Sequence, residues 1–351
     1  REYRFVHYGL FVTFFPHLLA GPVLHHAEVM PQFARPGTFR FNPENFAVGL
    51  TIFAIGLFKK VVLADGIAEF ATPVFDAAGK GATLTFLAAW GGALSYTFQL
   101  YFDFSGYSDM AVGLARLFGI VFPANFNSPY KAASIIEFWR RWHMTLSRFL
   151  RDYLYISLGG GRYHPLRRHA NMMATMLLGG LWHGAGWTFV IWGGLHGLYI
   201  VLNHLWRGLH KRWLARCSLP PAPARALGQL LTFVAVVVAW VFFRAESLAA
   251  AQAMLEGMAG LNGISKADPY YFGAPELKGL LAMFVIAWGL PNAQQLLRSY
   301  RPVLHTYPGD IPEAGRLRWR PSAAWALLTA ALLITAAVNL TQVSEFLYYQ
   351  F

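Results

Sequence analysis

The chain has 351 residues, of which 56% are hydrophobic and only 13% are charged, and its mean hydropathy is +0.38. Soluble domains carry roughly a quarter of charged residues, so this composition excludes an ordinary soluble protein and indicates an integral membrane protein. The formal net charge of +12 does not indicate nucleic-acid binding, because the basic residues fall mostly in loops between apolar runs, as membrane topology requires, and no nucleic-acid motif is present.

Seven apolar runs are candidates for membrane segments. A straight span needs roughly 20 apolar residues, and fewer suffice where a segment is broken or re-entrant. The runs cover residues 5–24, 46–64, 84–104, 172–205, 227–243, 279–290 and 323–340. The chain begins at Arg1 without a methionine or a signal-peptide pattern, and we expect further membrane segments to precede it. The predicted fold is an all-α membrane bundle forming one domain over residues 1–351.

The segment 131–158 has a different pattern from the seven runs. Its apolar and aromatic residues recur at helical spacing on one face, and its arginines lie on the other. This pattern predicts a basic amphipathic helix that lies in the membrane interface and contacts lipid headgroups. At helical pitch His143 shares the apolar face with Trp139 and Leu146, so we expect its ring to point inward.

The run 172–205 is long enough for two short helices that break at Gly184-Ala185-Gly186. His183 directly precedes this break and lies within an apolar stretch. An ionisable side chain at membrane depth is costly, which makes it a functional candidate, although a buried histidine bonded to a backbone carbonyl is the structural alternative. Broken helices are tolerated only where they face protein or a water-filled cavity, so the pattern predicts an internal chamber.

Loop charges predict an orientation. The loop 206–226 is purely basic and the loop 298–322 is mainly basic, whereas 244–278 between them has mixed charges. The positive-inside rule places the two basic loops in the cytoplasm and the third outside. The loop 162–169 is also basic, so the segment after it enters the membrane and returns.

The candidate chemistry depends on two histidines. There is no Gly-x-Ser-x-Gly elbow, and the only cysteine, Cys217, lies in a basic loop. A neutral histidine in a low-dielectric chamber can act as a general base. We therefore predict that His183 takes a proton from an acceptor hydroxyl, which attacks a thioester, and that His143 assists or lines the tunnel. No histidine pair has the i,i+3 or i,i+4 spacing of metal ligands on one helix face, so no metal is predicted.

Further residues are candidates for lining the tunnel or binding substrate. Asp103 and Asp109 end an apolar run with Ser105 between them, and they could orient a histidine or bind a substrate hydroxyl. The favoured structural alternative is pairing with Arg116, Lys131, Arg140 or Arg141, or capping a helix that starts near Ser108. The remaining candidates are Trp139, Trp142, Trp182, Trp187 and Arg162, the last of which follows three glycines and could meet a donor phosphate.

Four motifs in this order resemble a known family. They are FPHLLAGP at 15–22, QLYFDFSGYSDMA at 99–111, EFWRRWHMTLS at 137–147 and GGLWHGA at 179–185. Their order and spacing are similar to those of the membrane-bound O-acyltransferases (MBOAT), and more closely to the bacterial branch with alginate O-acetylase, cellulose-acetylating and D-alanyl-teichoic-acid members. The end of the chain, SEFLYYQF at 344–351, is similar to that branch as well.

The resemblance implies a multi-helix bundle around a central tunnel, with re-entrant and interfacial helices. The family's catalytic histidine matches His183, and its second motif histidine matches His143. The implied donor is acetyl-CoA or a similar acyl thioester, with no permanently bound cofactor. In the polysaccharide branch, a periplasmic acyltransferase partner receives the acyl group. The resemblance thus implies a multi-pass protein of the bacterial inner membrane that serves O-acetylation of an exopolysaccharide such as alginate or cellulose.

Two alternatives remain open. One is a D-alanyl or other acyl transferase acting on teichoic acid or another glycan. The other belongs to a different class, a polysaccharide transporter or export component, because broken helices and buried polar groups are also signs of a transporter. Inverted repeats would favour the transporter, and none is apparent in the sequence.

Overall fold

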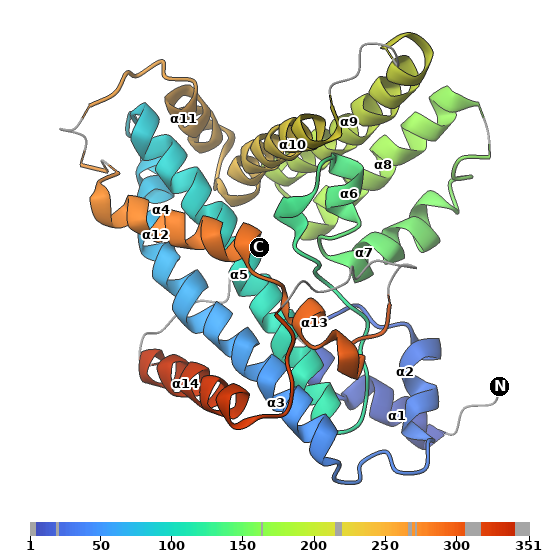
Figure 1. Cartoon of the computed structure of the whole chain (residues 1–351). Helices are drawn as coiled ribbons and strands as arrows, with labels where there is room; N and C mark the ends of the chain where they lie inside the picture. Colours follow the sequence, from blue (N-terminus) through green and yellow to red (C-terminus); the bar gives the residue numbers. More distant parts are fainter. Residues whose placement is uncertain are drawn as a thin grey trace.

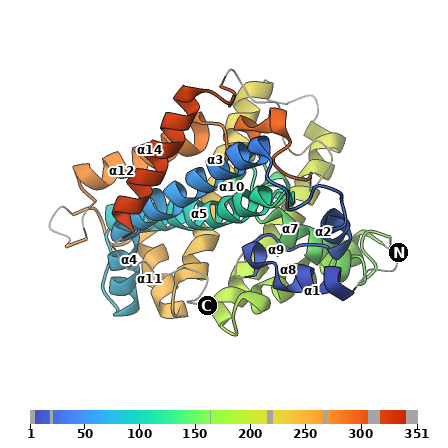
Figure 2. The same cartoon turned by 90° about the horizontal axis from the view of Figure 1, so that it is seen from below.

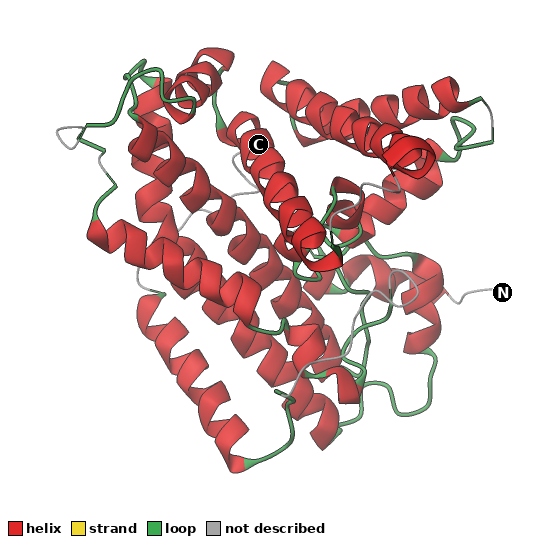
Figure 3. Ribbon diagram, turned by 45° about the horizontal axis from the view of Figure 1, so that its top comes forward, coloured by secondary structure: helices red, strands yellow, loops and turns green. Residues whose placement is uncertain are grey.

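The computed structural model describes residues 5–18, 21–162, 164–214, 220–265, 269–270, 272–305 and 317–340. Within these ranges the chain is helical, and the only β-type pairing is an isolated bridge between Pro123 and Leu304 (Figure 3). The predicted all-α class is confirmed for the described part of the chain. Cys217 and the terminal motif 344–351 lie outside these ranges.

Two long helices form the centre of the molecule (Figure 1). The helix α3 (Pro43–Phe58) continues through a π-helical turn, η2 (Lys59–Ala64), into α4 (Asp65–Gly79). The next helix, α5 (Phe86–Leu117), packs along α3 and α4. Both elements extend well beyond the apolar runs 46–64 and 84–104 that predicted them.

Glycines allow α3 and α5 to approach closely. A Cβ atom added at Gly56 would lie 2.5 Å from the carbonyl oxygen of Gly106, and one at Gly113 would lie 2.6 Å from that of Gly49. Small residues at such crossings let helix backbones meet directly, as in many membrane proteins. The close contact therefore depends on glycines in both helices.

A second pair of helices carries the GGLWHGA motif. The helix α8 (Pro165–His183) ends where predicted, and α9 (Trp187–Leu209) begins after Gly184-Ala185-Gly186 and packs back along α8. A Cβ atom at Gly180 would lie 2.3 Å from the Phe189 carbonyl oxygen. Gly180, three residues before His183, thus allows α8 and α9 to touch, a role that the sequence alone does not reveal.

The remaining elements surround these two pairs. As Figure 2 shows from below, α14 covers one side of α3, and α11 lies against α4 and α5. Apart from the elements of the segment 131–158, these surrounding elements are α1 (Phe5–Thr13), η1 (Phe15–His17), α2 (His26–Phe33), η5 (His210–Leu214), α10 (Pro221–Arg244), α11 (Leu248–Met258), α12 (Ala274–Phe284), η7 (Val285–Gly289), α13 (Ala293–Leu296), η8 (Arg298–Tyr300) and α14 (Ala323–Asn339).

The run 5–24 does not form one continuous helix. The helix α1 ends at Thr13, and the chain then makes a short 3₁₀ turn that contains Pro16. Proline lacks the backbone N–H and clashes with the preceding turn of an α-helix, which accounts for the break. Only two described helices, Pro43–Gly79 and Pro221–Arg244, are both long and apolar enough to meet a length-and-hydropathy criterion for spanning a membrane.

The segment 131–158 is likewise not the single helix that its pattern predicts. It is divided into η3 (Pro129–Lys131), α6 (Ile135–Trp139), α7 (Met144–Phe149) and η4 (Leu150–Tyr155). The Asn127 N–H donates to the Arg141 carbonyl, and the Met144 N–H donates to the Asn125 carbonyl. These bonds replace helical ones, so the chain bends between α6 and α7. The placement of this segment in the membrane interface stays a prediction.

Candidate active site

The bend between α6 and α7 and the end of α8 bring His143 and His183 to one small cavity of about 20 Å³. The two histidines come from motifs 40 positions apart in the sequence. Most of the other lining residues are aromatic. The cavity is lined by Leu100, Phe104, Trp139, Trp142, His143, Leu146, His183, Trp192, Trp240 and Phe243.

His143 is buried and has an unusual backbone conformation. Its φ angle is +39°, in the left-handed region, and its residue is 4% exposed. Histidine is one of the few non-glycine residue types enriched in this region. Such strained residues cluster at functional sites and persist only where the surrounding structure holds them in place. Here the two backbone bonds that close the bend on either side supply that support.

Asn125 fixes the ring of His143. Its side-chain oxygen Oδ1 lies 3.0 Å from His143 Nδ1, while its Nδ2 donates to Ser108 Oγ at 3.0 Å. Because this oxygen can only accept, Nδ1 carries the proton, which leaves a lone pair on Nε2. Thr145 Oγ1 also donates to Asn125 Oδ1, at 2.8 Å, and accepts from the Val23 N–H. The sequence analysis did not single out Asn125, which lies outside the four motifs.

Burial, with a smaller contribution from the nearby His183 ring, lowers the pKa of His143 from 6.5 to about 3. His143 lies between α6 and α7, outside the two candidate spans. Its ring is therefore neutral at physiological pH. A neutral histidine with one free lone pair can accept a proton or a hydrogen bond from a substrate.

His183 is the last residue of α8, and its ring is half-buried. Its centroid lies 5.2 Å from the ring of Trp192, in an edge-to-face arrangement, and 5.2 Å from that of Phe243. These contacts come from α9 and α10, so three helices set the position of the ring.

A third histidine, His196, lies behind the cavity wall and is fully buried. Its Nδ1 accepts a hydrogen bond of 3.3 Å from Nε1 of Trp139. The sequence analysis passed over His196, although the signal that identified His183, a histidine within an apolar run, applies to it equally.

The two carboxylates of the QLYFDFSGYSDMA motif pair with lysines of η2. Lys59 Nζ lies 2.6 Å from an oxygen of Asp109, and Lys60 Nζ lies 2.8 Å from one of Asp103. The prediction that Asp103 and Asp109 have structural partners agrees with these pairs, but the arginines and Lys131 proposed as partners are wrong. The alternative of a helix cap is wrong as well, because α5 continues through Ser108. The sequence analysis chose cations that follow the aspartates in the chain. The actual partners are set by the close packing of α3, with η2 after it, on α5.

Only some of the other residues that were predicted to line the tunnel lie at the cavity. Trp139 and Trp142 line the cavity. Trp182 and Trp187 are 60% and 73% exposed, and Arg162 is exposed too, so the structure does not bring these three residues to the cavity. The hydroxyl of Ser105 is buried without a hydrogen-bond partner among the described residues. In the same ranges no group of three or more metal-ligating side chains is found.

A larger pocket of about 700 Å³ shares Trp139 with the small cavity. Its walls include the basic side chains of Arg140, Arg141 and Arg151. On α8 it is lined by Met172, Thr175 and Met176, at the spacing of one helix face leading toward His183. The pocket is large enough for a sizeable ligand, and its three arginines outnumber its one carboxylate, Glu137, which favours a ligand with negative charge.

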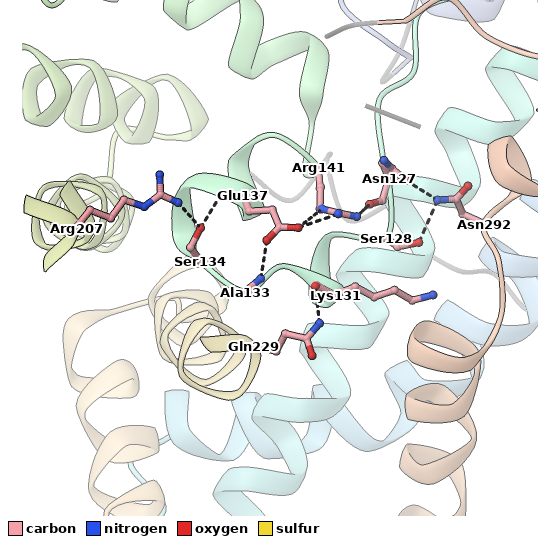
Figure 4. A network of polar contacts seen from close by, with 10 residues as sticks. All are labelled: Asn127, Ser128, Lys131, Ala133, Ser134, Glu137, Arg141, Arg207, Gln229 and Asn292. Carbon is pink, nitrogen blue, oxygen red and sulfur yellow. Dashed lines mark hydrogen bonds and ion pairs between the residues drawn. The ribbon is translucent and has the colours of Figure 1, made fainter. Parts of the chain in front are cut away.

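A polar network holds the wall of this pocket to the rest of the protein (Figure 4). The Arg141 guanidinium pairs with Glu137 at 2.8 Å and donates to the Asn127 carbonyl. Nδ2 of Asn292 donates to Oδ1 of Asn127 and to Ser128 Oγ, at 2.8 and 3.0 Å. Since Asn292 caps α13, the network connects α6 with α13 and stabilises the bend before His143.

The chain is similar in sequence to several known acyltransferases. The chain is 42% identical to a peptidoglycan O-acetyltransferase of Helicobacter pylori over 99% of the chain. It is 41% identical to a probable alginate O-acetylase, AlgI, of Azotobacter vinelandii over the same share. A teichoic acid D-alanyltransferase of Streptococcus thermophilus is 32% identical over 54% of the chain and 49% of its own length.

The chain spans 65% of the length of the Helicobacter protein and 70% of the Azotobacter protein. The sequence profile of one family matches residues 1–251, which contain both cavity histidines. Both the profile and the near-complete coverage by relatives agree with the resemblance carried by the four motifs. The chain belongs to the membrane-bound O-acyltransferase family and is a membrane protein.

Proposed function

We propose that this protein is an O-acyltransferase that moves an acetyl group from a thioester toward a polysaccharide. The observation that carries the proposal is that His143 and His183 line the same small cavity. General-base catalysis requires a basic group within reach of the proton that it removes. The cavity is lined by two imidazole rings, and either could contact a small substrate group bound there.

In the proposed reaction, His183 is the general base. An acceptor hydroxyl oxygen attacks the thioester carbonyl carbon while His183 takes the hydroxyl proton. The carbon–sulfur bond then breaks, and the proton passes from His183 to the departing thiolate, so the products are an oxygen ester and a free thiol. His143, with its free Nε2 lone pair, is proposed to position the acceptor or to line its path.

The larger pocket is the proposed entrance for the donor. Guanidinium groups bind phosphate strongly, so Arg140 and Arg151 suit the phosphates of acetyl-CoA or a similar carrier-bound thioester. The helix α8 begins near the basic residues Arg167 and Arg168 and ends at His183, about 27 Å farther along at 1.5 Å per residue. The positive-inside rule predicts that the basic start of α8 is cytoplasmic, which supports a multi-pass protein of the bacterial inner membrane with its donor on the cytoplasmic side.

The acceptor is proposed to be an exopolysaccharide such as alginate or cellulose, reached through a periplasmic acyltransferase partner. The name of the Azotobacter relative supports alginate, and that of the Helicobacter relative adds peptidoglycan as a candidate. The teichoic acid relative keeps D-alanyl transfer as the second candidate.

The test is the O-acetyl content of the polymer in cells that carry His183→Ala, with membrane expression of the variant confirmed. We expect loss of acetyl groups with a normal polymer yield. His210→Ala, a histidine in η5 outside both pockets, is the matched control and should leave acetylation unchanged. Unchanged acetylation in His183→Ala would remove His183 from the mechanism, and loss of the polymer itself would favour an export function.

A further inference from the structure

The backbone of Asn125 is held on both sides of the residue. On one side, the Ala124 N–H donates to the Leu304 carbonyl at 3.0 Å. On the other, the Met144 N–H donates to the carbonyl of Asn125 itself at 2.9 Å. Asn125 is 1% exposed. This asparagine of the loop after α5 is therefore fixed in the interior of the protein, beside the bend that carries His143.

The side-chain amide of Asn125 has one orientation that satisfies its neighbours. The hydroxyl and the backbone N–H of Thr145 lie 2.8 and 3.4 Å from the same amide atom. A backbone N–H can only donate, so this atom is the oxygen Oδ1. Because Oδ1 only accepts, it also requires the proton of the His143 ring on Nδ1. The other end of the amide, Nδ2, donates to Ser108 Oγ on α5 at 3.0 Å.

Thr145 connects this amide to the FPHLLAGP motif. Val23 directly follows the motif, and its N–H donates to Thr145 Oγ1 at 2.9 Å. The Thr145 hydroxyl can accept this bond and still donate its own proton to Asn125 Oδ1. Thr145 is 0% exposed, so bulk water does not compete for either bond. A motif that the proposed chemistry does not otherwise use thus supports the amide that contacts His143.

The second nitrogen of the His143 ring, Nε2, lies on the side of the ring away from Asn125. His143 lines the small cavity and Asn125 does not. We infer that Asn125 is a positioning residue for acyl transfer, which directs the Nε2 lone pair of His143 into the cavity to accept a hydrogen bond from the acceptor. The donor of this bond is a group of the acceptor other than the reacting hydroxyl, whose proton goes to His183. This inference rests on the proposed function.

An amide suits this task better than a carboxylate. A carboxylate beside Nδ1 would stabilise the protonated ring, as it does in the serine hydrolase triad, and a protonated ring has no lone pair on Nε2. The rings of Phe104 and Phe126, which pack on His143, carry no charge. The titratable group that acts on His143 is His183, and it also opposes protonation. The two histidines thereby take different tasks, with His183 as the base and His143 as a hydrogen-bond acceptor.

The test measures free thiol released from acetyl-CoA by the purified full-length protein, as kcat and KM over a range of pH. Asn125→Ala should lower kcat roughly tenfold or more, with KM within about threefold of the parent value, because the ring can then turn and change tautomer. Asn125→Asp should move the acid limb of kcat upward by about one pH unit or more, since a neighbouring carboxylate raises the pKa of His143. A role confined to stability would lower the melting temperature and leave the acid limb in place.

Gln32→Glu is the matched control. Gln32 is also 1% exposed, and its side-chain amide bonds to both backbone groups of Val121, in the same loop as Asn125. This change from amide to carboxylate should lower the melting temperature and leave the acid limb in place.

Thr145 provides a second test, which decides the matter if the Asn125 variants do not fold. Thr145→Val removes the hydroxyl at nearly constant volume, and Thr145→Ser keeps it. Loss of one buried hydrogen bond should lower kcat by about threefold or more in Thr145→Val, with Thr145→Ser within about twofold of the parent.

The outcomes separate this inference from the proposed function. A folded Asn125→Asp protein whose acid limb stays in place would overturn the inference, and so would an equal shift in Gln32→Glu. Equal rates of folded Thr145→Val and Thr145→Ser would overturn it as well. In each of these cases acyl transfer by the parent protein stands. If the parent releases no thiol from acetyl-CoA, the proposed function itself fails, and the inference fails with it.

Discussion

The ring of His143 is kept neutral by burial and is held in place by its hydrogen bond to Asn125. Its Nδ1 proton is directed to Asn125, and burial keeps the ring uncharged. A residue in the left-handed region at the centre of a buried hydrogen-bond network is a costly arrangement, of the order of 1–3 kcal/mol for the backbone alone. The cost is offset by the network that joins Asn125, Thr145 and Ser108.

Burial of His143 makes the stability of the protein depend on pH. Its pKa is 6.5 in the unfolded chain and about 3 in the folded protein, so the unfolded state binds more protons between these values. Stability is therefore lost as the pH falls from 6.5 toward 3. We expect the apparent melting temperature of the purified protein to fall more steeply over this range than that of His143→Asn. Equal slopes for the two proteins would contradict the assignment.

The paired charges between η2 and α5 give a second prediction at the residue scale. Lys59 and Asp109 are 12% and 3% exposed at their side chains. Removing one partner of a buried ion pair leaves the other charge uncompensated, which typically costs about 3–5 kcal/mol. Lys59→Met and Asp109→Asn should each destabilise the protein by this order, and the double variant by clearly less than their sum. A double-mutant cycle of unfolding free energies measures the difference, and strict additivity would show that the pair is not coupled.

Local sequence indicated some of these residues and not their partners. The histidine within GGLWHGA was visible because a polar residue stood in an apolar run. The lysine partners of Asp103 and Asp109 were not visible, because Lys60 and Lys59 lie 43 and 50 positions away from them. Only the packing of two helices brings these residues together. Asn125 was missed for the same reason, because its importance depends on the bend that places His143 beside it.

At the scale of elements, the hairpin of α8 and α9 positions the catalytic candidate. The two helices touch through backbone atoms, because a Cβ atom at Gly193 would lie 2.3 Å from the Met176 carbonyl oxygen. The neighbouring Gly194 faces Leu177, and a Cβ atom there would meet only a side-chain methyl, at an ordinary distance of 3.5 Å.

These two glycines make a matched pair for experiment. Gly193→Ala should separate α8 from α9, lower the stability by about 1–3 kcal/mol as overpacking does, and reduce activity by moving His183. Gly194→Ala should be neutral or slightly stabilising, because alanine favours a helix over glycine by up to about 1 kcal/mol. Thermal unfolding and thiol release, measured on both variants, check the prediction. Similar effects of the two substitutions would show that the close backbone contact is not what places His183.

The sequence predicted the break of α8 but not that of the segment 131–158. In the first case, two glycines flank one alanine in an otherwise apolar run, which marks a turn directly. In the second, Trp139, Trp142 and Leu146 keep a helical spacing across the bend, so the local pattern continues where the helix does not. The bonds that produce the bend come from Asn125 and Asn127, and no pattern within 131–158 contains them.

At the scale of the whole molecule, the basic residues gather at one end of the α8–α9 hairpin. The rings of His169 and His204 lie 6.4 Å apart, which places the start of α8 beside the end of α9, opposite to His183. The two helices therefore form a hairpin, and its entry into the membrane and return stay a prediction. The turn η5, which follows α9 and contains Lys211 and Arg212, belongs to the same basic end.

The orientation can be measured directly. A fluorescent protein fused after His210 should fluoresce, because loop 206–226 is predicted to be cytoplasmic by its positive charge. Alkaline phosphatase fused after Gly263 should be active, because loop 244–278 is predicted to lie outside. The opposite result at both sites would reverse the orientation and place the proposed donor pocket on the wrong side of the membrane.

The central claim is that acyl transfer takes place in the cavity between the two histidines, with His183 as the base. The most direct measurement is the rate of thiol release from acetyl-CoA by purified His183→Gln, with its folding confirmed by the melting temperature. Loss of a general base typically lowers a rate by about 10²- to 10⁴-fold, and we predict a loss in this range, with His210→Gln unchanged. A folded His183→Gln protein that retains the parent rate within about twofold would contradict the account.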